Sequence, residues 1–140
     1  AYAPPHNAAI PTLVGEMLDQ GTARRDKFAL AQELENVGAS LSFEVDGTHL
    51  KISGRCLARD LPLVIALLAE QLREPAFSAE ELEKVKTQLS GDLQRALEQP
   101  DYRAEVAFAR EIYPEGHPNR PETTEAFIAA VNRATVDDLR

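Results

Sequence analysis

The stretch Leu13–Thr22, "LVGEMLDQGT", decides the fold of this chain. It overlaps a stripe of apolar residues spaced i, i+3, i+4, i+7, i+8. This spacing is typical of an amphipathic helix with one buried face. The stripe comprises Ile10, Leu13, Val14, Met17 and Leu18. We therefore expect a helix over residues 8–19, with Gly21 just beyond it as a stop. The opposite face carries Thr12, Gly15 and Glu16, and its chemistry is the question that this sequence raises.

A second helix and a β-hairpin are expected next. Asp26 is a suitable N-cap for a helix that ends near Gly38. Apolar and polar residues then alternate over 41–46 and again over 50–52, on either side of Asp46-Gly47. Alternation around such a dipeptide predicts a hairpin with a two-residue turn.

The remainder predicts helices. One runs over "DLPLVIALLAEQL" (60–72), capped by Asp60, and its apolar content suggests deep burial. Another opens with the capping box formed by Ser78 and Glu81, and Pro100 starts a further helix that ends near Ile112. Helices over 124–132 and from Thr135 complete the chain. The predicted fold is α+β, with helices packed on one face of a small antiparallel sheet, in a single domain (1–140) preceded by a Pro-rich arm (1–7).

Composition excludes several classes of function. The chain has 140 residues, 44% of them hydrophobic, and a net charge of −8, which argues against binding to nucleic acid or anionic membranes. The one cysteine, Cys56, cannot form an internal disulfide or a cysteine-only zinc site, and we expect an inert thiol. The sequence has no Gly-rich phosphate loop and no apolar run of membrane-spanning length.

The order of several segments resembles one family. "EMLDQGT" is followed by "LENVGASLSFEVDGTHLKISG", by "LPLVIALLAEQLREPAFSAEELEKVKTQL" and by "YPEGHP". Together they resemble the pitrilysin/insulinase family of zinc metallopeptidases, which includes the mitochondrial processing peptidases and the core subunits of the respiratory bc1 complex. The resemblance extends from about Ala8 to the end of the chain.

Active members of that family carry His-x-x-Glu-His on their first helix, where two histidines hold Zn²⁺ and the glutamate activates its water. The resemblance places the first histidine position at Thr12, the base at Gly15 and the second histidine at Glu16. A third ligand position falls near Asp92, and Val85 stands where a supporting glutamate is frequent. Both histidines and the base are thus absent, which implies no catalytic residues and no zinc in this chain.

Other polar residues offer little chemistry. Glu16 and Asp92 could meet across a groove, but two carboxylates without imidazole suit harder cations than Zn²⁺, and we interpret both as surface residues. His6 is expected in the arm, His49 on the hairpin and His117 in a loop. None has another histidine at ligand spacing, so all three are interpreted as surface histidines.

The resemblance implies a non-catalytic domain of a larger zinc protease, with a structural role and a role in binding peptide and closing the substrate chamber. Zinc is then expected only in a separate active domain. Two alternatives are an assembly module with no peptide role and a divergent metallopeptidase that uses Glu16 and Asp92. Because the family's flanking strands are missing, we expect an excised piece that contacts other peptidase domains and self-associates through exposed sheet edges. Some bacterial relatives are periplasmic, so analogy favours the cell envelope.

Overall fold

The structure, a computed structural model, describes residues 8–46, 49–117 and 119–140. The expected arm at residues 1–7, which contains His6, lies outside the described residues. Helices and strands follow in the order α1 (Ala9–Met17), α2 (Lys27–Asn36), β1 (Ser40–Asp46), β2 (His49–Arg55), a short 3-10 helix (Ala58–Asp60), α3 (Leu61–Arg73), α4 (Ala79–Leu97), α5 (Pro100–Ile112), α6 (Thr124–Arg133) and α7 (Val136–Leu139). The expected mixture of helices with a small antiparallel sheet is confirmed.

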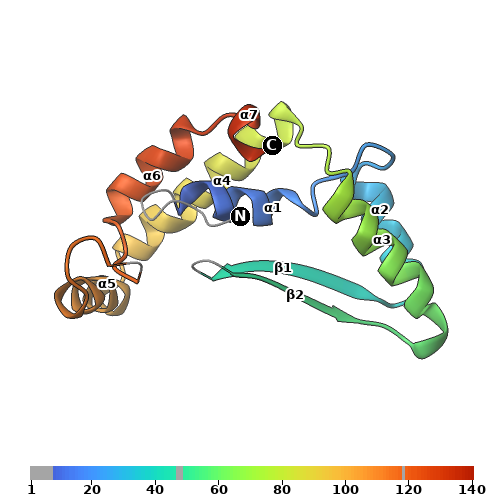
Figure 1. Cartoon of the computed structure of the whole chain (residues 1–140), viewed down its shortest axis with the longest axis horizontal. Coiled ribbons are helices and arrows are strands. Elements are labelled where there is room, and N and C mark those ends of the chain that lie inside the picture. The colour runs from blue at the N-terminus through green and yellow to red at the C-terminus, as the bar shows by residue number, and fades with distance from the viewer. Residues whose placement is uncertain (1–7, 47–48, 118) are drawn as a thin grey trace.

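The main core lies where α1, α4, α6 and α7 meet (Figure 1). The apolar stripe of α1 supplies its centre, because Leu13 is 0% exposed and Met17 is 1% exposed. Leu82 of α4, Val131 of α6 and Leu139 of α7 complete the buried cluster with Ala9, Phe77 and Ala134. The stripe that predicted an amphipathic helix therefore also predicted the centre of the core.

The hairpin lies against α1 and is paired over its whole described length. Strands β1 and β2 are antiparallel, with Ser40 opposite Arg55 and Val45 opposite Leu50. The apolar side chains of β1 are half-buried, whereas every described residue of β2 is exposed. The expected Asp46-Gly47 turn includes Gly47, which lies outside the described residues.

Helices α2 and α3 lie side by side at one end of the molecule, and α5 lies at the other (Figure 1). The deep burial expected for the helix over 60–72 is wrong. Only Val64, Leu67 and Gln71 of α3 are buried, while Leu61 and Ile65 are 50% and 53% exposed. Apolar content shows what a helix can bury, but not which neighbours cover each of its faces.

The predicted helix caps have mixed outcomes. The Asp26 side chain accepts a hydrogen bond from the Ala29 amide at 2.8 Å, as expected of an N-cap. Asp60 and Ser78 stand at the predicted cap positions but make no such bond, so the capping box at Ser78 is wrong. Its partner Glu81 instead forms ion pairs that draw its carboxylate away from the cap. A capping box does form between Thr135 and Asp138.

None of the helices in the described ranges has the length and apolar character needed to cross a membrane.

Candidate functional site

The polar face of α1, where the resemblance places a zinc motif, is the first candidate site. Thr12 is half-buried, and its hydroxyl donates a hydrogen bond to the Ala8 carbonyl oxygen at 2.9 Å. Gly15 is buried and Glu16 is exposed. The three positions share one helix, but each has a different environment, and only Glu16 presents a polar side chain to solvent.

Gly15 is buried because strand β1 lies directly on it. A Cβ atom at this position would lie 2.6 Å from Val45 Cγ2 and 3.7 Å from Val45 Cβ. Carbon atoms in ordinary contact are about 3.5–4.0 Å apart, so a methyl group fits here only if the Val45 side chain or its strand shifts. A glycine inside a helical pattern often marks such a close approach, and that signal was present in the sequence.

The charge of Asp92 on α4 acts on Glu16, although the structure gives no contact between the two side chains in its described residues. Although Glu16 is exposed as a residue, neighbouring atoms shield its carboxyl partly from water, which raises its pKa, and the negative charges of Asp19 and Asp92 raise it further. Asp92 is exposed on α4 and forms an ion pair with Arg95 one turn along the same helix. Val85 is half-buried and packs against the core cluster instead of supporting a site.

These residues do not fit a catalytic zinc ion. Thr12 is a weak ligand whose hydroxyl is already bonded to backbone, and Gly15 has neither a base nor room for one. Within the described part of the chain, no group of three or more His, Cys, Asp or Glu side chains could hold a metal ion. Two carboxylates alone are a poor donor set for zinc, which in proteins favours His and Cys ligands.

The other residues singled out from the sequence lie on other elements. His49 is exposed on β2, and Cys56 is partly buried just beyond that strand. The His117 ring stacks on Tyr113 at 4.7 Å between ring centroids, and its Nδ1 accepts a hydrogen bond from the Asn119 amide at 3.1 Å. These contacts explain the position of His117 as part of a folded loop.

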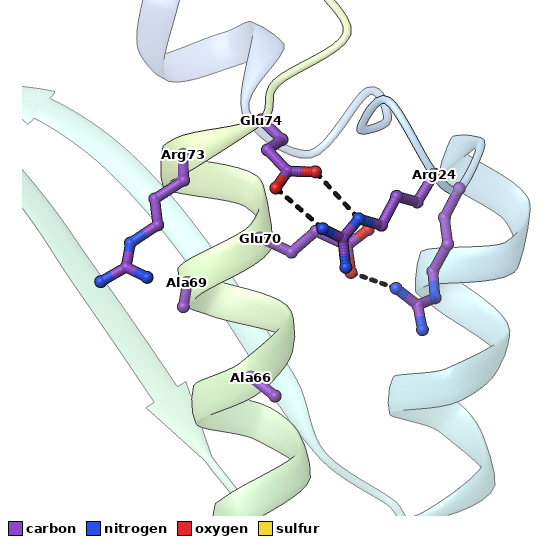
Figure 2. Close-up of a pocket in the computed structure, with 7 residues that line it drawn as sticks. Arg24, Ala66, Ala69, Glu70, Arg73 and Glu74 are labelled. Atoms are coloured by element: carbon purple, nitrogen blue, oxygen red, sulfur yellow. Dashed lines mark hydrogen bonds and ion pairs between the residues drawn. The ribbon is translucent and has the colours of Figure 1, made fainter.

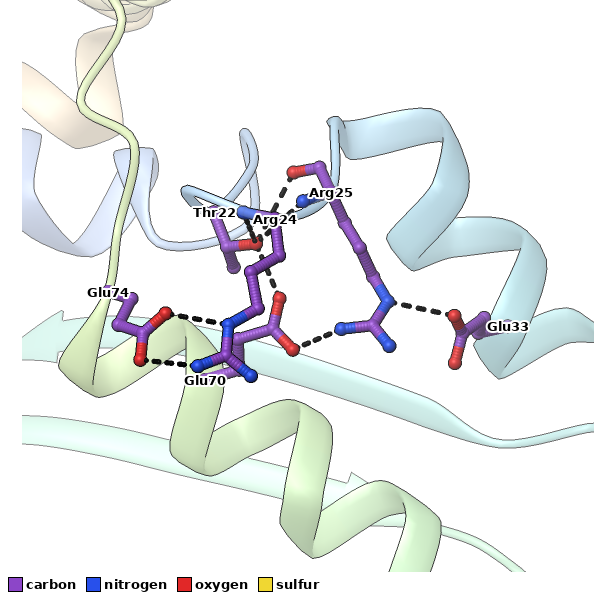
Figure 3. Close-up of polar contacts among 6 residues, drawn as sticks. All are labelled: Thr22, Arg24, Arg25, Glu33, Glu70 and Glu74. Atoms are coloured by element: carbon purple, nitrogen blue, oxygen red, sulfur yellow. Dashed lines mark hydrogen bonds and ion pairs between the residues drawn. The ribbon is translucent and has the colours of Figure 1, made fainter.

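The loop after α1 is the second feature with organised polar groups. Gly21 has φ of +124°, a conformation that favours glycine, and its carbonyl accepts from the Ala76 amide at 3.1 Å. The buried Thr22 hydroxyl donates to Glu70 Oε1 at 2.6 Å and accepts from the Arg25 amide at 3.0 Å (Figure 3). Thr22 therefore joins the loop after α1 to the last turns of α3.

Arginine–glutamate pairs reinforce this joint. Arg24 binds Glu74 through two hydrogen bonds of 2.9 Å, and Arg25 bridges Glu70 of α3 and Glu33 of α2 (Figure 3). Hydrogen bonds from Thr22 and then Arg25, with the nearby positive charges, hold the pKa of Glu70 below its ordinary value. We call these six residues, Thr22, Arg24, Arg25, Glu33, Glu70 and Glu74, the loop–α3 network.

A surface cavity of about 610 Å³ lies beside this network, lined by Arg24, Arg25, Ala66, Ala69, Glu70, Arg73 and Glu74. Its charged groups are already paired with one another, apart from Arg73, which points away from the two glutamates (Figure 2). The cavity therefore gives no convergent set of groups for catalysis.

Sequence reasoning missed Val45 and the loop–α3 network as organised features. Thr22 and Glu70 are 48 positions apart and Arg24 and Glu74 are 50 apart, so no local spacing links them. Val45 belongs to an ordinary alternating strand, and only the glycine inside α1 hinted that a side chain lies against it.

Comparison with known proteins supports the resemblance. The family model described as Insulinase (Peptidase family M16) matches residues 1–121. The "Non-peptidase homolog YmxG" of Helicobacter pylori is 28% identical over 91% of this chain and 29% of its own length. The alpha subunit of the mitochondrial-processing peptidase of Solanum tuberosum is 24% identical over 99% of this chain and 27% of its own.

The fold has a solved counterpart. A crystal structure named as a peptidase M16 inactive domain, from Pseudomonas fluorescens, superposes with a TM-score of 0.83 at 22% identity. The match covers 95% of this chain and 32% of that one. The expected family is confirmed, and the chain spans less than a third of the length of these relatives.

Proposed function

The chain belongs to the insulinase family, peptidase family M16, and we propose that it serves as a non-catalytic domain that helps to enclose and bind peptide beside an active domain. The relatives are about three times longer, so this role concerns a larger assembly. In this role the domain contributes a folded surface around the peptide and no catalytic groups.

The observation that carries this proposal is the contrast along α1 and the loop that follows it. The positions of the zinc motif hold Thr12, Gly15 and Glu16, whereas Met17, Leu18 and Thr22 are buried and Gly21 keeps a glycine conformation. A domain kept for its shape needs the second set of residues and can dispense with the first.

Zinc is accordingly assigned to a separate active domain. The alternative of a divergent metallopeptidase requires Glu16 and Asp92 to hold a metal and activate its water. Among the described residues, neither carboxylate has a histidine beside it to complete a metal site, and Asp92 already forms an ion pair with Arg95. With glycine at the position of the base, the same two carboxylates would have to hold the metal and also accept the proton from its water.

Peptide binding is supported by the hairpin. Each strand of the described sheet has one neighbour, so the outer edges of β1 and β2 carry backbone groups able to pair with an extended peptide. Strand β1 also runs along the degenerate motif face, because Val45 lies on Gly15. A peptide added there would lie beside α1 without meeting a catalytic group.

The test is to titrate fluorescein-labelled extended peptides of mixed sequence with the purified chain, by fluorescence anisotropy, and then to weigh the peptides by mass spectrometry. We expect saturable binding and intact peptides, with or without added Zn²⁺. Cleavage would overturn the non-catalytic assignment, and no saturable binding would remove the peptide role.

A second candidate function, an assembly module without a peptide role, is favoured by exposed apolar side chains. Leu61 and Ile65 of α3 are 50% and 53% exposed, and Phe108 and Ile112 of α5 are 67% and 55% exposed. Surfaces of this kind mark contacts between proteins or domains. Light scattering measures whether the chain self-associates, and a monomer at all concentrations would exclude self-association.

A further inference from the structure

The catalytic-base position of this domain is not merely empty, because another part of the fold occupies it. The buried backbone of Gly15 in α1 lies under Val45, the residue that pairs with Leu50 near the turn end of the hairpin. A Cβ atom on Gly15 would be 2.6 Å from Val45 Cγ2 and 4.0 Å from Leu50 Cδ1. The zinc motif of the family therefore disagrees with the packing of this chain as well as with its residue types.

We propose that Val45 closes the position of the missing general base, so that inactivity is fixed by the packing of the hairpin on α1 and not only by lost side chains. A glutamate at position 15 would begin with a Cβ atom that overlaps a methyl group of Val45. Restoring the motif residues alone would then push the hairpin away from α1. This inference rests on the non-catalytic function proposed above.

The steric part of the proposal is tested by whether Gly15→Ala raises or lowers the stability of the chain. Alanine in place of a helical glycine normally shifts the folding equilibrium about threefold to fivefold toward the folded state. Gly91 of α4 is the matched control, because a Cβ there meets only Arg95 Nη1, at 3.8 Å. We expect Gly91→Ala to stabilise the chain and Gly15→Ala to destabilise it, both measured by urea unfolding.

Val45 is tested by repeating Gly15→Ala in a Val45→Gly background. Removal of the valine side chain takes away the close contact, so the alanine should now be stabilising. The same destabilisation in both backgrounds would show that Val45 is not the closing residue. A stabilising Gly15→Ala in the unaltered chain would overturn the inference outright.

The metal part uses ligand-restored variants. A chain carrying Thr12→His, Glu16→His and Asp92→Glu adds the missing ligands and leaves Gly15 unaltered, and we expect it to bind zinc. Adding Gly15→Glu should weaken zinc binding at least tenfold and lower the urea midpoint. Adding Val45→Gly as well should recover the zinc affinity and the urea midpoint. Isothermal calorimetry and elemental analysis measure the zinc binding, and urea unfolding measures the midpoint.

The outcomes separate the two proposals. Equal zinc affinity with and without Gly15→Glu would contradict the closure by Val45 and leave the proposed function intact. No zinc binding by the chain with the three restored ligands would also count against the inference, because it would mean that more than Val45 closes the site. Stoichiometric zinc or peptide cleavage in the unaltered chain would instead contradict the proposed function.

Discussion

The two parts of "LVGEMLDQGT" behave differently in the folded molecule. Leu13 and Met17 are fully buried in the core, and Thr22 fixes the following loop to α3. Glu16 lies exposed on the opposite face, with the half-buried Thr12 just before the stretch. One helix can thus lose its catalytic residues while its packing residues remain, because the two sets of side chains contact different surroundings.

The largest expected difference between the two faces comes from Leu13. Leu13→Ala removes a side chain that is 0% exposed at the centre of the core, and it should lower the free energy of unfolding by about 2–5 kcal/mol. Urea denaturation measures the change. The matched variant Leu61→Ala, on a half-exposed side chain, should alter stability much less. Similar losses for both leucines would contradict the placement of the core.

Thr22 provides a test of the loop–α3 network. Thr22→Val keeps the shape of the side chain but removes the hydroxyl that donates to Glu70 and accepts from the Arg25 amide. Leaving buried polar groups unpaired should cost about 1–3 kcal/mol. The same change at the exposed Thr87, whose hydroxyl donates to the Glu83 carbonyl at 2.8 Å, should have little effect. Equal effects of the two substitutions would show that the network adds no stability.

The pH dependence of stability should also distinguish the two regions, starting with Glu70. The pKa of Glu70 is lowered in the folded chain, so its contribution to stability is present above the ordinary glutamate pKa and is lost as the pH falls through the folded value. The difference in stability between the unaltered chain and Glu70→Gln should therefore shrink between pH 7 and pH 3. Urea midpoints across that range provide the measurement, and a constant difference would contradict the assignment.

Glu16 should show the opposite sign and the smallest effect. Its pKa is raised, so its contribution to stability is present below the ordinary glutamate pKa and is lost as the pH rises through the folded value. Glu16→Gln should hence stabilise the chain at pH 7, on the order of 0.3 kcal/mol because solvent screens an exposed carboxylate. The gain should vanish in acid, and a loss at pH 7 would mean that the Glu16 carboxylate makes a favourable contact.

Much of the fold could be predicted because its signals are local. Pro100 and Ile112 bound α5 as expected, and Asp26 caps α2. The predictions that were wrong involve side chains that could bind more than one partner. Glu81 pairs with Lys27, which is 54 positions away, and therefore does not cap α4. No local pattern contains that competition.

The candidate site was predicted in part for the same reason. The motif positions on α1 follow from the resemblance to the family, and the charge of Asp92 on a different helix does raise the pKa of Glu16. The contact of Val45 with Gly15 depends on how the hairpin lies over α1, which is a property of the tertiary fold. The assignment of the chain as one domain, and of its site residues as non-catalytic positions, remains a prediction for experiment.

The most direct test of the central claim is the zinc content of the purified chain after exposure to Zn²⁺ and removal of free ion, by elemental analysis. The non-catalytic account predicts no stoichiometric zinc, in the unaltered chain and in Glu16→Ala and Asp92→Ala alike. One tightly held zinc ion per chain, lost in either variant, would contradict the account and establish a rebuilt metal site on this face of α1.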